Sequence, residues 1–461
     1  MLFGLNKYGR QAVFSEGSYL LKLAMPILIA QAAQVGVGAV DTLMAGHASA
    51  NDLAAVALGT NVFLTLYITF LGIMTALQPI IAQLYGAGET SKIGVHGRQG
   101  LWFGLFLGIF GMLLLWGLIK PLQSVLDMKN AYVNQTFHDF IFYIAMSMPA
   151  AMIHRAFYAY ASSLNRPIPI MVVSTVALLL NIPMNYIFVY GKFGLPAMGG
   201  AGCGLASMIC FWFNAIVLGV YVTKNHYFTN FGLWQRFEWP NWITQKNLIR
   251  LGIPIGLSFF LEVSLFTFIS LLVARFGIIQ VAAQQVVISI TSLIYMIPQS
   301  IGIALAVCVG QAIGAGQYER ARFISGLGLL IGLILACCTG ILLLVFRHFW
   351  VGLYIQDTAV IALGANLLIF AAVFQLSDAT QTITSYALRG YKLTKIPMLI
   401  HAFSFWGLGL GLGCLLGLYF NMQLYGFWTA LVIALTGAAV ALVWYLLKQS
   451  QARIVLAERK A

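Results

Sequence analysis

One carboxylate stands near the middle of a membrane-length apolar segment. Glu262 lies in the run from Leu251 to Gly277, and no Lys or Arg occurs between Arg250 and Arg275. An ionised acid at bilayer depth costs about 2.5 to 3.5 kcal/mol on insertion scales, so it should face a polar interior and have a partner. Phe266 follows four residues later on the same helical face. A carboxylate beside an aromatic ring can hold a cation between its charge and the quadrupole of the ring.

A second acid, Asp378, lies in the middle of another apolar segment. The sequence around it, FQLSDATQTITSY, places Ser, Thr and Gln side chains near the carboxylate. If Glu262 and Asp378 converge, they would share a proton or a cation such as Na⁺ and titrate as a coupled pair. The alternative for either acid is a structural role in helix packing.

The composition excludes a soluble domain. Hydrophobic residues make up 61% of the chain, charged residues only 8%, and the mean hydropathy is +0.90. The net charge of +13 does not indicate nucleic acid, because the basic residues lie in short loops between apolar runs. The six cysteines all fall in apolar segments, and the chain has no H-E-x-x-H motif and no Walker loop. We therefore expect no enzyme, no metal cluster and no ATP binding.

Apolar runs of about 20 residues recur, which favours helices over barrel strands. The predicted fold is an all-α polytopic membrane protein with twelve spans. An even number of spans puts both termini on one side, and if that side is the cytoplasm it collects 20 of the 25 Lys and Arg residues. The expected spans are residues 18–44, 53–83, 98–119, 132–160, 167–190, 199–223, 248–274, 280–310, 321–346, 358–387, 396–417 and 424–447.

The chain repeats itself with a shift of 228 residues. No gap is needed from Lys22 to Gly104, and Pro26 aligns with Pro254. The turn QLYGAG of the first copy aligns with QAIGAG of the second. Six spans per copy predict two parallel six-helix lobes around a central cavity, related by an axis along the membrane normal. The expected domains are residues 1–223, a cytoplasmic connection at 224–247, and residues 248–461.

Polar positions at which the two copies differ are the better candidates for ion chemistry. Gln34 takes the place of Glu262, and Asp41 takes the place of Ile269. Asp41 is either an ion site or an ordinary acid near a helix end. Tyr295 has a counterpart in Tyr67, so it serves either cation contact or packing.

Other polar side chains are candidates for the wall of a substrate cavity. Neutral groups of this kind either line a cavity or join helices to one another. A loop acid, Asp357, either guides a cationic substrate or is simply solvated. We expect His154, Arg155, Arg389, Lys392 and Lys395 to anchor the inside surface. The neutral cavity candidates are Gln34, Asn61, Gln284 and Gln285, and the acidic ones are Asp41 and Asp357.

Taken together, these features resemble the multidrug and toxic compound extrusion (MATE) family, and its NorM branch in particular. The resemblance covers Ser18 to Lys448 and includes the two turns, LNIPMNYIFVYG in the fifth span and LSDATQTITSYALRGYK in the tenth. It implies a transporter of the bacterial inner membrane with both termini in the cytoplasm. Such proteins export amphipathic, mostly cationic drugs and dyes in exchange for Na⁺ or H⁺, and they need no cofactor, ATP or nucleic acid.

The resemblance also assigns roles to residues. It implies a cation site at Glu262, Asp378, Tyr295 and Phe266, with Na⁺ possible at the two acids. It further implies a second ion or proton site in the first lobe, at Asp41, Asn181 and Asn185, although some family members carry an acid where this chain has Asn185. The expected partners are small organic cations, the coupling cation and membrane lipid. The alternative function is a flippase for a lipid-linked sugar on the same two-lobe plan.

Overall fold

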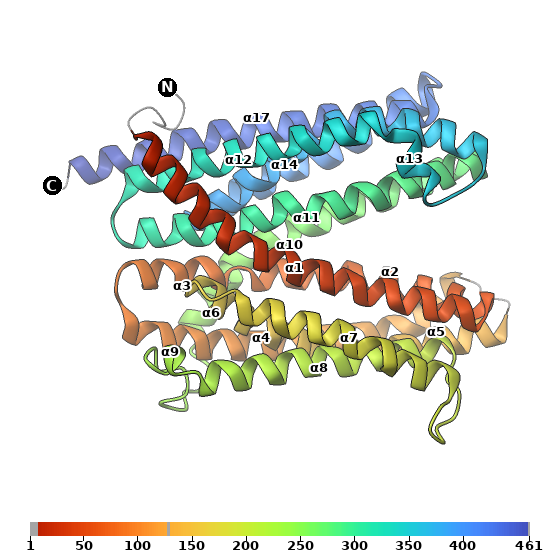
Figure 1. Ribbon diagram of the computed structural model, residues 1–461, viewed down its shortest axis with the longest axis horizontal. Helices are drawn as coiled ribbons and strands as arrows, with labels where there is room; N and C mark the ends of the chain where they lie inside the picture. The colour runs from red at the N-terminus through yellow and green to blue at the C-terminus, as the bar shows by residue number, and fades with distance from the viewer. Residues whose placement is uncertain (1–7, 127–129, 460–461) are drawn as a thin grey trace. The chain divides into compact units, whose positions relative to one another are not determined.

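The computed structural model describes residues 8–126 and 130–459, and that part of the chain is built from helices without any strand. Twelve helical segments in it are long and apolar enough to cross a membrane, which confirms the predicted fold class and number of spans. The membrane segments are α1 (Arg10–Ala48), α2 (Ala50–Met74) with α3 (Leu77–Gly86), α4 (Thr90–Leu126), α5 (Ala131–Ala145) with α6 (Met148–Ser163), α7 (Ile168–Tyr190), α8 (Gly200–Lys224), α10 (Trp242–Val273), α11 (Ile278–Gly314), α12 (Tyr318–Val345), α14 (Thr358–Gly390), the segment from α15 (Lys395–His401) to η4 (Leu415–Tyr419), and α17 (Gln423–Glu458) (Figure 1). Two short helices, α9 (His226–Thr229) and α13 (Arg347–Gly352), lie between spans.

Two of the spans are interrupted within the membrane-length segment. The break between α2 and α3 begins at Thr75, whose hydroxyl donates to the carbonyl of Gly72. The break between α5 and α6 contains Ser147, whose hydroxyl donates to the carbonyl of Ile144 at 2.6 Å. Such bonds from a side chain to the backbone compete with the regular helix ladder and bend helices. Apolar periodicity does not reveal them, so the sequence predicts each of these spans as one continuous helix.

The chain divides into two compact units. The N-unit is Pro26–Gly256, and the C-unit is Leu257–Ala461 together with Met1–Met25. Within the N-unit, α4 lies close to α6 because Gly104 presents no side chain there: an added Cβ would stand 2.8 Å from the carbonyl oxygen of Met152. Within the C-unit, α11 packs closely on α14, where a Cβ on Gly302 would stand 2.6 Å from the ring of Tyr386. Small residues at helix contacts are the usual basis of packing between membrane helices.

Both units contain the turn that the sequence repeat predicts. Gly88 and Gly316, the last residues of the two GAG turns, have left-handed φ angles of 72° and 73°. Glycine adopts this conformation without steric penalty. The amides of Ala87 and Ala315 donate to the carbonyls of Gln83 and Gln311, each at 2.9 Å.

The helix packing next to these turns repeats as well. The aligned glycines Gly100 and Gly328 each receive the side chain of an aligned leucine, Leu77 in the first copy and Leu305 in the second. The repeat therefore preserves packing as well as sequence.

Two helices are shared between the units. The first turns of α1, up to Met25, belong to the C-unit, where Glu16 pairs with Arg320 of α12 at 2.8 Å. The first turns of α10 belong to the N-unit, where a Cβ on Gly252 would stand 2.6 Å from the carbonyl oxygen of Ile73. Along the sequence, the first turns of α1 precede the first half of the repeat and those of α10 precede the second half. In the structure, the first turns of α1 pack into the C-unit and those of α10 pack into the N-unit.

The aligned prolines, Pro26 and Pro254, lie inside α1 and α10 next to these two crossing points. A proline inside a helix removes one backbone hydrogen bond and bends the helix.

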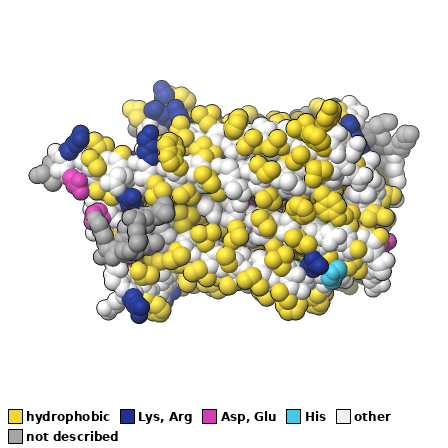
Figure 2. Space-filling view, turned by 90° about the horizontal axis from the view of Figure 1, so that it is seen from above, with side chains coloured by type: hydrophobic (Ala, Val, Ile, Leu, Met, Phe, Trp, Pro, Cys, Tyr) yellow, Lys and Arg dark blue, Asp and Glu magenta, His cyan; other side chains and the backbone are white. Residues whose placement is uncertain are grey.

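The surface shown in Figure 2 has the composition of a membrane protein: hydrophobic side chains cover its middle, and Lys and Arg side chains lie toward its two ends.

Candidate functional site

The buried carboxylate of Asp378 begins a polar stripe along α14. Gln381 donates from Nε2 both to Asp378 Oδ1 and to Thr382 Oγ1, at 3.1 Å each. Tyr295, on α11, lies near Thr382 and interacts electrostatically with Glu262 and Asp378. Hydrogen bonds therefore link Asp378, Gln381 and Thr382 inside the C-unit, and Tyr295 approaches them from α11.

Glu262 approaches this stripe from α10. Its carboxylate is half-buried and interacts electrostatically with Asp378 and with Arg389 of α14. Among the described residues, no donor forms a hydrogen bond with Glu262. The ring of Phe266, one turn further along α10, packs edge-to-face on Phe374 of α14, with the centroids 6.3 Å apart. The structure thus brings Glu262, Asp378 and Tyr295 together, and it places Phe266 against the turn of α14 that precedes Asp378.

Arg389 is a functional candidate that the sequence analysis placed wrongly. We expected it to anchor the inside surface, yet its side chain is buried with 6% exposure. Its guanidinium carbon lies 3.9 Å from the ring centroid of Tyr386 and 4.8 Å from that of Phe259. Cation–π contacts stabilise a desolvated guanidinium at such distances. The missed signal is the spacing of Asp378, Thr382 and Arg389 at i, i+4 and i+11, which places them along one face of a helix.

The same expectation was wrong for His154 and Arg155 of α6, which are also buried. Arg155 donates from Nη2 to Gln34 Oε1 at 3.2 Å. Lys395 is exposed as expected, and Lys392 is half-buried, with burial lowering the pKa of its ammonium group. The positive-inside pattern indicates on which side of a membrane a basic residue lies, but not whether its side chain points into the protein.

A second polar cluster lies in the N-unit around Asp41. Its Oδ1 accepts hydrogen bonds from the amides of Asn185 at 2.7 Å and Asn181 at 3.3 Å, and its Oδ2 accepts one from the hydroxyl of Ser207. Cys203 donates from its thiol to the backbone carbonyl of Asp41 at 3.4 Å. The structure brings the three predicted residues together and adds two from α8, which the sequence analysis did not single out.

Asp52 is a further buried carboxylate that the sequence analysis did not select. Its Oδ1 accepts from the Tyr132 hydroxyl at 3.0 Å and from the backbone N–H of Gly200 at 2.7 Å. Its Oδ2 accepts from Ser49 at 2.6 Å. The carboxylate joins α2 and α5 to the beginning of α8, the helix that carries Cys203 and Ser207. The sequence signal for it was a Ser-x-x-Asp pair at a helix start.

The remaining cavity candidates have different surroundings. Gln284 is buried and donates from Nε2 to the hydroxyl of Ser270 at 2.9 Å. Asn61 and Gln285 are exposed on α2 and α11. Asp357 is exposed and caps α14, accepting hydrogen bonds from the amides of Ala359 and Val360.

In the part of the chain that the structure describes, no three His, Cys, Asp or Glu side chains lie close enough to hold a metal ion, and all six cysteines are free.

The family model MatE matches the chain twice, over residues 26–187 and 254–415. The chain belongs to the MatE family. The two matches are displaced by the same 228 residues that align the two halves of the sequence. A probable multidrug resistance protein NorM of Neisseria meningitidis serogroup B is 54% identical over 446 residues, 97% of each chain. The multidrug resistance protein PmpM of Pseudomonas aeruginosa is 39% identical over 93% of this chain and 90% of its own.

Solved structures agree with this assignment. The MATE transporter NorM-NG in complex with the dye rhodamine 6G and a monobody matches with a TM-score of 0.82 and 50% identity, covering 95% of both chains. The resemblance to the NorM branch is therefore confirmed. Members of this family are membrane transporters, so the chain is a transporter rather than an enzyme, and it is an integral protein of a bacterial membrane.

Proposed function

We propose that this MATE transporter is a cation-coupled antiporter that exports amphipathic, mostly cationic drugs and dyes by alternating access. The observation that carries the proposal is the pair of Glu262 and Asp378, which interact inside the C-unit. No described donor forms a hydrogen bond with Glu262, so its carboxylate is open to a proton or to a cation such as Na⁺. The names of the multidrug resistance relatives and the dye bound to NorM-NG support the substrate class.

Coupling would follow from competition for this negative charge. A bound Na⁺ or H⁺ relieves the repulsion between the two carboxylates, and a cationic drug offers the same relief. Export requires only that the coupling ion and the drug differ in their affinities for the two orientations of the transporter. The required energy comes from the ion gradient.

The test is efflux of rhodamine 6G from proteoliposomes at fixed pH, driven by a sodium jump on the side opposite the dye. Wild type, Glu262→Gln and Asp378→Asn are measured side by side, and a pH jump without sodium is the second arm. Asp139→Asn is the matched control, because within the described part of the chain the side chain of this acid bonds only Gln135 and His138 of its own helix α5. We expect ion-driven efflux from wild type and from the control, and none from the two site variants.

Each outcome assigns the function. Efflux that follows sodium identifies a sodium antiporter, and efflux that follows only pH identifies a proton antiporter. Normal efflux from both site variants would refute the proposed role of the acidic pair. A wild-type protein that responds to neither gradient would favour the flippase for a lipid-linked sugar.

We further propose that Asp41, with Asn181 and Asn185, forms a second ion or proton site, and that both termini lie in the cytoplasm of a bacterium. The Asp41 carboxylate is buried, and three side-chain donors fix the position of its oxygens, which supports a binding role for a cation or a proton. Asp41→Asn in the same efflux assay tests the site. A fluorescent protein fused to the C-terminus tests the orientation, because it should fluoresce only if that end lies inside the cell.

A further inference from the structure

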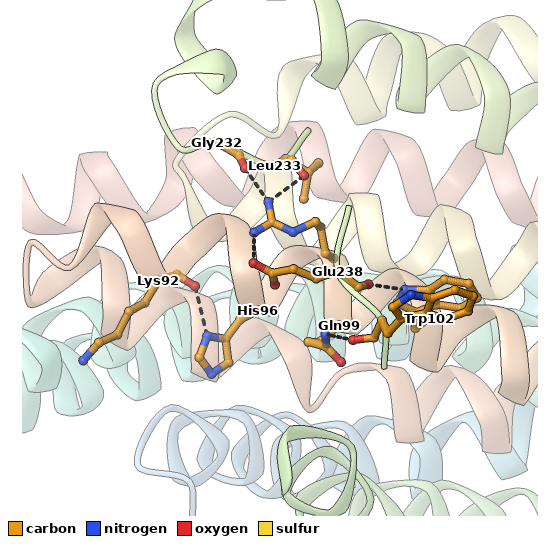
Figure 3. Close-up of polar contacts among 9 residues, drawn as sticks. Lys92, His96, Gln99, Trp102, Gly232, Leu233 and Glu238 are labelled. Carbon is orange, nitrogen blue, oxygen red and sulfur yellow. Dashed lines mark hydrogen bonds and ion pairs between the residues drawn. The ribbon is translucent and has the colours of Figure 1, made fainter. Parts of the chain in front are cut away.

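The connection between α8 and α10 is fixed against α4 along residues 231–241, which we call the strap. Arg98 of α4 donates from Nη1 to the carbonyl oxygens of Gly232 at 2.5 Å and Leu233 at 2.9 Å. Its Nη2 lies 2.8 Å from Glu238 Oε1. Figure 3 shows Gly232, Leu233 and Glu238 gathered around this guanidinium. One buried arginine therefore binds the strap at both its beginning and its end.

The next residues of α4 hold the end of the strap. Trp102 donates from its indole N–H to the carbonyl oxygen of Glu238 at 2.9 Å (Figure 3). Gln99 donates from Nε2 to the carbonyl oxygen of Trp239 at 2.9 Å and accepts the amide N–H of Asn241 at 2.7 Å. The second copy of the repeat has Gly, Leu and Leu at the positions aligned with Arg98, Gln99 and Trp102. This set of contacts is thus specific to the half that carries the connection.

The depth of the strap follows from the sequence of α4. Residues 101–119 form an uncharged run of 19 residues. At 1.5 Å per residue such a helix spans about 28 Å, close to the hydrocarbon thickness of a bilayer. Trp102 and Trp116 stand near the two ends of this run, where tryptophan prefers to lie. Arg98 and the strap are therefore at the level of the lipid headgroups.

The strap presents aromatic side chains outward at this level. Phe237 and Trp239 are 72% and 74% exposed. Their ring centroids are 5.3 Å apart, and Trp239 stacks on Trp102 at 6.2 Å. Trp102 in turn stacks on Phe106 of α4, an exposed side chain that lies one turn further into the apolar run. The rings form a continuous ladder from the headgroup level toward the acyl chains.

The charge around the ladder is positive. Arg236 is exposed in the strap, and Lys246 and Arg250 are exposed on the first turns of α10. Trp242, Lys246 and Arg250 recur every four residues, so they share one helical face. Glu238 is the only acid between residues 225 and 261, and Arg98 already pairs with it.

We propose that the strap and the first turns of α10 form a binding site for the headgroup of an anionic phospholipid. Arg236, Lys246 and Arg250 supply the positive charge for its phosphate. Trp239, Trp102 and Phe106 line the path of an acyl chain. Arg98 is a positioning residue: it fixes the strap before the lipid binds, which lowers the ordering cost of the complex. The site is independent of drug and ion transport.

The test is lipid binding by native mass spectrometry of the delipidated, full-length transporter. Phosphatidylglycerol is compared with phosphatidylcholine of the same acyl chains. The variant Arg236→Gln/Lys246→Gln/Arg250→Gln is compared with a control that loses three other basic side chains, Lys120→Gln/Lys192→Gln/Arg347→Gln. Each base near an anionic lipid contributes about fivefold in affinity, so the triple variant should lose up to about a hundredfold for phosphatidylglycerol.

The control variant should bind phosphatidylglycerol like wild type, and phosphatidylcholine should bind weakly to all three proteins. Glycerol phosphate at millimolar concentration should not displace the lipid, because the acyl chain contributes to binding. Equal retention of the two lipids by wild type would overturn the proposal, as would equal loss in both triple variants. Arg98→Gln keeps all three outward bases but frees the strap, and it should weaken phosphatidylglycerol binding severalfold. An unchanged affinity in Arg98→Gln would remove the positioning role.

Discussion

The carboxylate of Asp52 gives the sharpest stability prediction. Replacement by alanine removes an acceptor that serves the Tyr132 hydroxyl, the Gly200 N–H and the Ser49 hydroxyl. Gly199, the residue before α8, has no side chain with which to cap the helix. The Asp52 carboxylate, on α2, caps α8 instead by accepting the N–H of Gly200. Without it, the first amide of α8 and the Tyr132 phenol lose their acceptor.

The magnitude follows from the contacts. A hydrogen bond to a charged group contributes about 1.5 to 3 kcal/mol, and neighbouring bonds do not add fully. We therefore expect Asp52→Ala to lower the free energy of unfolding by about 3 to 6 kcal/mol. Asp52→Asn keeps one oxygen for Tyr132 and Gly200 and loses only the charge and the Ser49 donor, so it should cost about 1.5 to 3 kcal/mol. Gly199→Ala should also destabilise the protein, because its Cβ would stand 2.5 Å from Asp52 Oδ1.

The assay is reversible unfolding in mixed micelles by SDS titration, followed by tryptophan fluorescence. Tyr132→Phe is measured alone and combined with Asp52→Asn, which gives the coupling energy of the pair in a double-mutant cycle. Since α8 carries Cys203 and Ser207, dye efflux should fall more in Asp52→Ala than in Asp52→Asn. The reasoning is refuted if Asp52→Ala unfolds within about 0.5 kcal/mol of wild type, the range of an ordinary surface substitution.

Three further predictions follow from single contacts. Ser207→Ala removes a hydrogen-bond donor from the Asp41 carboxylate and should lower the free energy of unfolding by about 1.5 to 3 kcal/mol in the same SDS titration. An unchanged unfolding midpoint would mean that this bond does not stabilise the fold. Gly332→Ala places a Cβ against Ile383 Cδ1 and should cost about 1 to 3 kcal/mol. Adding Ile383→Val removes that methyl group and should restore most of the lost free energy of unfolding in the double variant. Strictly additive effects of the two substitutions on this free energy would contradict the packing. Arg389→Gln should lower the coupling-ion concentration that half-saturates efflux, while Arg389→Lys should keep this concentration near the wild-type value. Equal half-saturating concentrations in the two variants would exclude an effect of the Arg389 charge on the acidic pair.

Much of the architecture is determined by the sequence alone. Hydropathy gives twelve spans because each membrane crossing must satisfy its backbone hydrogen bonds within an apolar helix of fixed length. The shift of 228 residues predicts repeated turns, and Gly88 and Gly316 adopt them with nearly the same φ. Glu262 and Asp378 are recognisable because a carboxylate is rare at bilayer depth.

The tertiary structure decides what these local signals leave undetermined. Sequence periodicity assigns a residue to a helical face, but the neighbour of that face depends on which helices pack together. For this reason Ser207 becomes a partner of Asp41, and Arg389 lies among aromatic rings instead of at the surface. The connection was predicted as a cytoplasmic loop, yet Arg98 binds it to α4 through contacts more than 130 residues apart in the sequence. Such contacts form only when the chain folds, because the donor and its acceptors lie on elements that are not neighbours in the sequence.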